Sequence, residues 1–264
     1  MADHTLSDED LAELQYARSL LENPGLAARI TNVIGAPIER GLERLPQGAQ
    51  SIIGAATRKS LNMALDFAIS TMTAEQRESS IRTHKTIVAL TGGAGGAFGL
   101  PALAIELPLS TTVMFRSIAD IARSEGESIK SAEARLACLE VFALGGTAAE
   151  DDATESGYFA VRAALAKALS EAAEYITERG IAQHSAPALV TFITKVAARF
   201  GIPVSQKAAA QAIPIVGAAG GALINTLFID HFQNVARGHF IVRRLERRYG
   251  RGEVKEEYVK LLTT

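Results

Sequence analysis

The sequence predicts an all-α protein that folds as a single domain of about nine or ten helices. The chain holds 46 alanines, and alanine combines the highest helix propensity with a small side chain that lets helices pack closely. Alternating apolar and polar runs are scarce, and neither Asn-Gly nor Asp-Gly occurs as a hairpin turn. Apolar residues make up 48% of the 264 residues, and no long repeat or low-complexity linker divides the chain. One domain over residues 1–264 is therefore expected.

The individual helices can be placed from spacing and from helix breakers. Ser7, with Asp10 three residues later, is a capping pattern that starts the first helix, and Asn23-Pro24-Gly25 ends it. Further along the chain, apolar residues recur every three or four positions, as on one face of a helix. Helices are expected within residues 1–25, at about 27–34, from 58 to about 72, and at about 110–125, 132–145, 157–179, 187–200, 226–249 and 253–262.

Two apolar segments, 86–115 and 208–229, depart from this amphipathic pattern. The first opens with the uncharged run Thr86–Ile105, and the second carries no charge at all. Either is long enough to cross about 30 Å of hydrocarbon as a helix. Glycines and prolines interrupt both, and each costs helix stability, about 1 kcal/mol for glycine and about 3 kcal/mol for proline. We expect two central Gly-rich helical hairpins, buried in the protein or dipping into a bilayer, with hairpin prolines Pro101, Pro108 and Pro214.

Glycine pairs within these segments favour close helix packing. Gly92 and Gly96 lie four residues apart, as do Gly217 and Gly221, so each pair lies on one helix face. A phosphate-binding loop is the alternative for the first pair. However, Phe98 stands where a dinucleotide fingerprint needs its third glycine, and no P-loop lysine follows. Close packing is the expectation for both pairs.

A series of motifs follows in a fixed order along the chain. They are Gly92–Pro101, Glu106-Leu107-Pro108, Arg116–Ala122, Glu150–Glu155 with Tyr158 and Arg162, Ala212–Ala218 and Ala222–Asn225. Their order and separation resemble those of the bacterial EcsC family, over about residues 20 to 250. The resemblance implies a membrane-proximal setting, because the family takes its name from association with an ABC-type exporter, and it implies no particular chemical reaction.

Glu106 is the only ionisable residue between Lys85 and Arg116. A carboxylate buried alone takes up a proton or requires a partner. Arg116 is the expected partner if Pro108 reverses or bends the chain, and a helix N-cap beside Pro108 is another structural role. The functional alternative is a proton-linked or ligand-binding carboxylate in an apolar pocket.

A basic amphipathic helix is expected at residues 237–251. Six arginines and one glutamate, Glu246, give this stretch a net charge of +5 in a chain whose total is −2. A stripe of this kind suits an anionic membrane surface, at about 1 kcal/mol per basic residue. A plain solvated helix face is the alternative, and nucleic acid is not expected as a partner. The arginines are Arg237, Arg243, Arg244, Arg247, Arg248 and Arg251.

Motifs for catalysis and metal binding are missing from the sequence. The five histidines form no HExxH, the single Cys138 cannot build a zinc site, and no G-x-S-x-G occurs. We therefore expect a non-enzymatic protein without cofactor or metal. The resemblance to the EcsC family implies that it is bacterial and acts near the membrane, where we expect it to bind lipid or a membrane-protein partner such as an ABC-type transporter. The N-terminus lacks a signal-peptide pattern, so we expect it in the cytoplasm, peripheral at the inner face of the membrane. The alternatives are a soluble helical module for interaction or small ligands and, third, an enzyme that uses Glu106.

Overall fold

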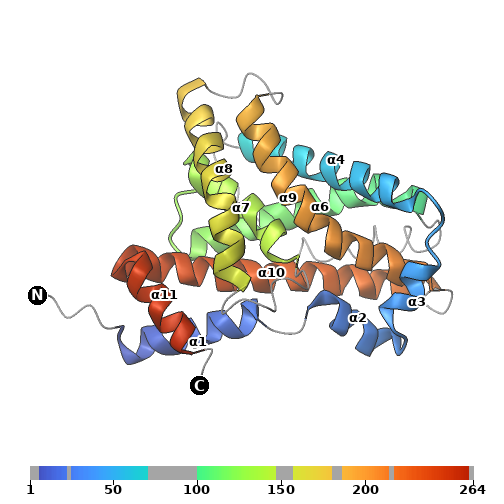
Figure 1. Cartoon of the computed structure of the whole chain (residues 1–264), viewed down its shortest axis with the longest axis horizontal. Coiled ribbons are helices and arrows are strands. Elements are labelled where there is room, and N and C mark those ends of the chain that lie inside the picture. The colour runs from blue at the N-terminus through green and yellow to red at the C-terminus, as the bar shows by residue number, and fades with distance from the viewer. Residues whose placement is uncertain are drawn as a thin grey trace, which may run out of the picture.

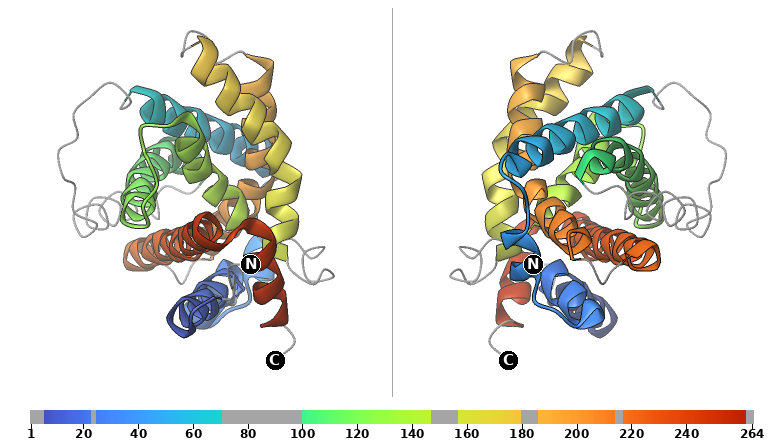
Figure 2. Two further views of the ribbon diagram at one scale, coloured as in Figure 1. Left: turned by 90° about the vertical axis from the view of Figure 1, so that its left-hand side faces the viewer. Right: turned by 90° about the vertical axis from the view of Figure 1, so that its right-hand side faces the viewer.

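The computed structural model describes residues 6–22, 25–70, 100–146, 157–179, 186–213 and 217–261. These residues form ten helices and no strand, which confirms the predicted all-α fold. The longest helix, α10, runs along the long axis of the molecule, with α1, α2 and α3 on one side and most other helices on the opposite side (Figures 1 and 2). The helices are α1 (Asp8–Leu21), α2 (Leu26–Ile34), α3 (Ile38–Glu43), α4 (Ala49–Ser70), α6 (Leu100–Ser124), α7 (Ala132–Leu144), α8 (Gly157–Arg179), α9 (Pro187–Gln211), α10 (Gly217–Tyr249) and α11 (Arg251–Lys260).

Several helix ends follow local capping chemistry. The Ser7 hydroxyl accepts a hydrogen bond from the Asp10 N–H at 3.2 Å, so α1 starts where its capping pattern predicts. Ser131 starts α7 in the same way, by accepting from the N–H of Ala134 at 3.1 Å. Each cap satisfies one backbone N–H that has no partner within the first helical turn. Gly35 ends α2 in the left-handed conformation, with φ of +67°, which glycine adopts without strain.

Two helices extend through prolines and beyond their expected ranges: α6 passes the expected hairpin prolines, and α9 passes its expected end at about residue 200. α6 already includes Pro101 and continues through Pro108, and α9 continues past residue 200 through Pro203. The expected reversal of the chain at Pro108 is therefore wrong. Pro108 is buried, and its carbonyl oxygen accepts a hydrogen bond from the Thr112 hydroxyl at 2.9 Å. Packing of a long apolar helix face outweighs the roughly 3 kcal/mol that an interior proline costs.

The apolar segment 208–229 is divided between two helices. α9 ends within it at Gln211, α10 begins within it at Gly217, and the two helices pack against each other. The prediction for Pro214 falls outside the described residues. The other apolar segment, 86–115, is described only from Leu100 onward, as the first part of α6.

The described close contacts occur at glycines that we had not singled out. A Cβ on Gly41 in α3 would overlap the backbone of Ala209 in α9, and a Cβ on Gly238 in α10 would lie 2.8 Å from the carbonyl oxygen of Ala17 in α1. These glycines let whole helices approach to backbone contact. Gly92 and Gly96 lie outside the described residues. Gly217 begins α10 and Gly221 is buried in it, and close packing at this pair stays a prediction.

Two hydrophobic clusters hold the helices together, and α10 contributes to both. The larger contains four phenylalanines whose neighbouring ring centroids lie 4.9–6.1 Å apart. The smaller joins α1, α8, the last turns of α10, and α11. The phenylalanines are Phe142, Phe200, Phe228 and Phe232, and the smaller cluster contains Leu14, Ala17, Tyr158, Ile241, Val242, Leu245, Val254 and Tyr258.

Candidate functional site

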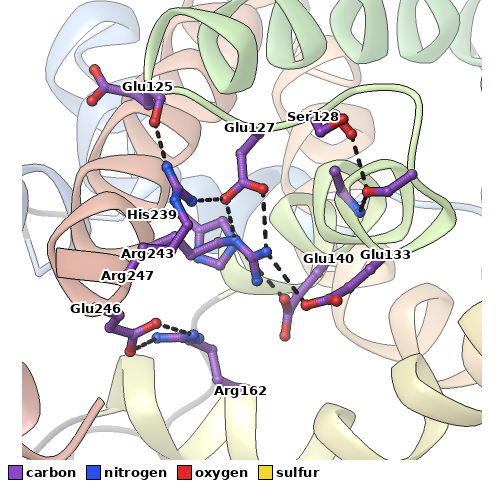
Figure 3. Close-up of polar contacts among 12 residues, drawn as sticks. Glu125, Glu127, Ser128, Glu133, Glu140, Arg162, His239, Arg243, Glu246 and Arg247 are labelled. Carbon is purple, nitrogen blue, oxygen red and sulfur yellow. Dashed lines mark hydrogen bonds and ion pairs between the residues drawn. The ribbon is translucent and has the colours of Figure 1, made fainter. Parts of the chain in front are cut away.

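The arginine-rich half of α10 faces acidic side chains from other parts of the chain. Arg243 Nε donates to Glu127 Oε1 at 2.7 Å, and Arg247 donates to the same carboxylate. Glu127 lies in the turn between α6 and α7, and Figure 3 shows how Arg243 and Arg247 converge on it. Burial alone raises the pKa of Glu127, but the hydrogen bonds and charges of the two arginines outweigh it, so the net pKa is below the usual value.

The N-terminal helix supplies a second set of acidic partners. Asp10 accepts from Arg248 Nη1 at 2.8 Å and from the Tyr249 hydroxyl at 2.6 Å, and Arg244 pairs with Glu13. The hydrogen bond from Tyr249 is the main reason that the pKa of Asp10 is lowered. Arg244 also lies 3.2 Å from Glu125 of the α6–α7 turn. We call this region the ionic end: residues 8–22, 124–133 and 237–260.

These ion pairs correct the expectation that the arginines of 237–251 form an open basic surface. Arg243, Arg244, Arg247 and Arg248 each have a carboxylate partner within the chain. The stretch 237–251 is also not one helix, since Gly250 separates α10 from α11 with a φ of +97°. The two remaining members are Arg237, which donates to the Asn234 side chain at 3.4 Å, and Arg251, which is exposed at the start of α11.

A buried polar cluster lies behind the arginines, between α7, α8 and α10. His239 Nδ1 forms a 2.9 Å hydrogen bond with the Tyr158 hydroxyl, and His239 Nε2 lies 3.7 Å from Glu140 Oε2. Burial raises the pKa of Glu140 to about 7, and burial is also the main reason that the pKa of His239 lies well below its usual value. Next to them Arg162 holds Glu246 through two hydrogen bonds of 2.7 and 2.8 Å (Figure 3).

Glu106 occupies a different buried site, near the start of α6. Both of its carboxylate oxygens accept from Lys207 Nζ, at 2.9 and 2.8 Å, and the two side chains are 6% and 0% exposed. The Lys207 ammonium also lies 4.9 Å from the ring centroid of Phe228, as a cation–π pair does. We call the surrounding region the apolar end: residues 100–113, 203–213 and 217–229.

The expected pairing of Glu106 with Arg116 is wrong. Both residues lie on α6, ten positions apart, which is about 15 Å along a helix axis. Arg116 is exposed and stacks over the Phe67 ring at 4.9 Å. The true partner, Lys207, immediately precedes the uncharged segment 208–229, and that position was the available signal for it.

The apolar end also exposes large hydrophobic side chains. Ile105 is 71% exposed, Leu109 is 50% exposed, and Leu223 is 45% exposed. A hydrogen bond of 2.7 Å from Gln233 to Ser117 sets the register of α10 against α6, which run in the same direction (Figure 1). Ile105 and Leu109 lie four positions apart on α6 and so share one helix face, and Leu223 is exposed on α10.

Neither a metal site nor a clear membrane span emerges from the described residues. Within them, no three His, Cys, Asp or Glu side chains gather closely enough to hold a metal ion. Among the described helices, α9 alone is long and apolar enough to cross a membrane, judged by length and composition. It carries the buried Lys207 and packs against α3, α4, α7, α8 and α10, as a core helix does.

Comparison with known proteins gives one match. The model of the EcsC protein family matches residues 20–245, which is most of the chain. No curated protein and no solved structure matches it.

Proposed function

The chain belongs to the EcsC family, and on that premise we propose that it is a non-enzymatic bacterial protein acting at the cytoplasmic face of the membrane. There it binds lipid or a membrane-protein partner such as an ABC-type transporter. The observation that carries this proposal is the exposed pair Ile105 and Leu109 on one face of α6, together with the exposed Leu223 of α10. Neighbouring exposed hydrophobic side chains are typical of surfaces that contact a membrane or another protein.

The proposed contact is hydrophobic rather than electrostatic. Moving a large apolar side chain out of water contributes about 1.5–3 kcal/mol, so these three together contribute on the order of 5 kcal/mol. Four arginines of the ionic end are neutralised by partners within the chain and add little attraction to anionic lipid. We therefore expect binding that changes little with salt, in contrast to attachment through a free basic helix.

Cosedimentation with lipid vesicles tests the proposal. The wild type is expected to bind phosphatidylcholine vesicles and phosphatidylglycerol-containing vesicles alike, at low and high salt. Ile105→Glu/Leu109→Glu should weaken binding by about 10-fold or more, because both charges would have to enter the lipid interface. The matched control is Tyr16→Glu/Val190→Glu, which alters two other exposed apolar side chains and should bind as the wild type does.

A soluble helical module for interaction or small ligands is the second candidate, and the internal pairing of the arginines favours it. Wild-type protein that pellets with neither kind of vesicle would exclude lipid binding and leave a membrane-protein partner or this soluble module. Enzymatic use of Glu106 has little geometric support, because Lys207 occupies both carboxylate oxygens in a buried site.

A further inference from the structure

His239 lies between two other buried polar groups where α7, α8 and α10 meet. Its Nδ1 is hydrogen-bonded to the Tyr158 hydroxyl at 2.9 Å, and its Nε2 faces Glu140 Oε2 across 3.7 Å. The three residues are 0%, 6% and 3% exposed, in the order His239, Tyr158, Glu140. Within the described part of the chain, Nε2 is buried and has no hydrogen-bond partner. Buried polar atoms are nearly always paired, so the gap between Nε2 and the carboxyl group requires an explanation.

We propose that Glu140 and His239 form a buried binding site for one exchangeable proton, with Tyr158 fixing the orientation of the imidazole. The proton is carried by the Glu140 carboxyl group and points toward Nε2, which accepts. Nδ1–H then donates to the Tyr158 hydroxyl oxygen. Loss of the proton leaves a buried carboxylate for which the described residues offer no hydrogen-bond donor, so proton release is linked to rearrangement of the helices around it.

The arginines near Glu140 do not keep its carboxyl group ionised. Arg162 and Arg243 both lower the pKa of Glu140, yet the pKa remains raised because burial outweighs them. Both guanidinium groups are already held by other carboxylates, Arg162 by Glu246 and Arg243 by Glu127. The charges that act on Glu140 are those of Arg162 on α8, Arg243 and Glu246 on α10, and Arg251 on α11. Other ionisable groups on the surrounding elements include Glu127 of the α6–α7 turn, Glu133, Arg135 and Cys138 of α7, Tyr158 of α8, Arg199 of α9 and His239 of α10.

The opposite pKa shifts of the two groups place the proton on Glu140 rather than on His239. Burial raises the pKa of Glu140 from 4.5 to about 7, whereas burial, Arg162 and Arg243 hold the pKa of His239 well below 6.5. The folded protein therefore binds a proton at Glu140 that the unfolded chain releases between pH 4.5 and 7. Stability from this group is complete below pH 4.5 and is lost as the pH rises through 7.

The test compares unfolding of the full chain by urea at pH values from 5 to 8. For the wild type relative to Glu140→Gln, the unfolding equilibrium constant should rise on the order of 100-fold between pH 5 and pH 8. The matched control is Glu133→Gln, on the same helix, whose carboxyl group is 55% exposed and also lies near Arg243. It should retain the wild-type pH dependence.

A direct titration keeps the proposal testable even where Glu140→Gln does not fold. In wild-type protein labelled with carbon-13 at glutamate, the assigned Glu140 carboxyl signal should titrate with a midpoint near 7. Tyr158→Phe, which removes the hydroxyl at Nδ1, should shift this midpoint, whereas a purely structural hydrogen bond would leave it unmoved. A midpoint between 4 and 5, or a wild-type to Glu140→Gln ratio that does not change with pH, would overturn the proposal.

Discussion

The apolar end and the ionic end, which lie at opposite ends of α10, hold their buried charges in different ways. At the apolar end, one ammonium, that of Lys207, holds both oxygens of the Glu106 carboxylate, and among the described residues this pair is isolated from other charges. At the ionic end, arginines and carboxylates form a network in which Arg243 approaches Glu127 and Glu133, and Glu127 in turn is shared with Arg247. An isolated pair has no substitute for a lost partner, whereas a network has several. The two regions should therefore respond differently to the loss of one charge.

The largest effect is expected at the apolar end, from Lys207→Met. Removing the ammonium leaves Glu106 buried without a cation, which should destabilise the protein by about 3–5 kcal/mol at pH 7. Urea unfolding measures this directly. The double variant Glu106→Gln/Lys207→Met should regain much of the loss, since no buried charge is left. Arg116→Met, at the exposed arginine first expected to be the partner, should cost less than about 1 kcal/mol. Equal costs for the two single variants would contradict the assigned pairing.

The second effect is a loss of folding stability at low pH, caused by His231. Burial lowers the pKa of His231 from 6.5 to about 4, and its Nε2 lies 2.7 Å from the carbonyl oxygen of Gly145. The unfolded chain therefore binds a proton that the folded protein does not, so stability is full above pH 6.5 and is lost as the pH falls toward 4. The loss from this residue is about 3 kcal/mol. Between pH 7 and pH 4.5, the free energy of unfolding measured with urea should fall more for the wild type than for His231→Gln. Parallel pH dependence in the two proteins would exclude His231 as the source.

The smallest effect is expected at the rim of the ionic end, from Arg248→Ala. Arg248 is 65% exposed and pairs with Asp10, which keeps the hydroxyls of Tyr249 and Ser7 as donors. Because water and these two donors replace the arginine, the loss should be below about 1 kcal/mol and should shrink further in high salt. Thermal unfolding at low and high salt measures both. A loss comparable to that of Lys207→Met would mean that the network does not share its charges as described.

Local signals predicted most of the helices, several with other ends than the structure has, and they did not predict which charged residues pair across the fold. Ser7 and Asp10 predicted the start of α1, because both groups of the cap lie within one turn. Nothing local connects Glu106 to Lys207 or Arg243 to Glu127, which lie 101 and 116 positions apart. The arginine stripe was visible in the sequence, but its neutralisation depends on which helices the fold brings against it. Glu140 had a weak signal, as a single carboxylate within the otherwise apolar stretch Leu136–Leu144. Pro108 gave a wrong prediction because its local cost to a helix is outweighed by packing against residues far away in the sequence.

The docking of α1 on α10 has a consequence for the order of events during synthesis. Asp10, Leu14 and Ala17 contact partners near residues 238 to 258, so α1 completes these contacts only after α10 and α11 have been made. At about 5–20 residues per second, this interval is on the order of tens of seconds. During that time the Leu14 and Ala17 face of α1 has no native surface to cover it. Before they pair with arginines, the carboxylates of α1, which begins Asp8-Glu9-Asp10, give the nascent chain a local negative charge. Such a charge disfavours association with other chains.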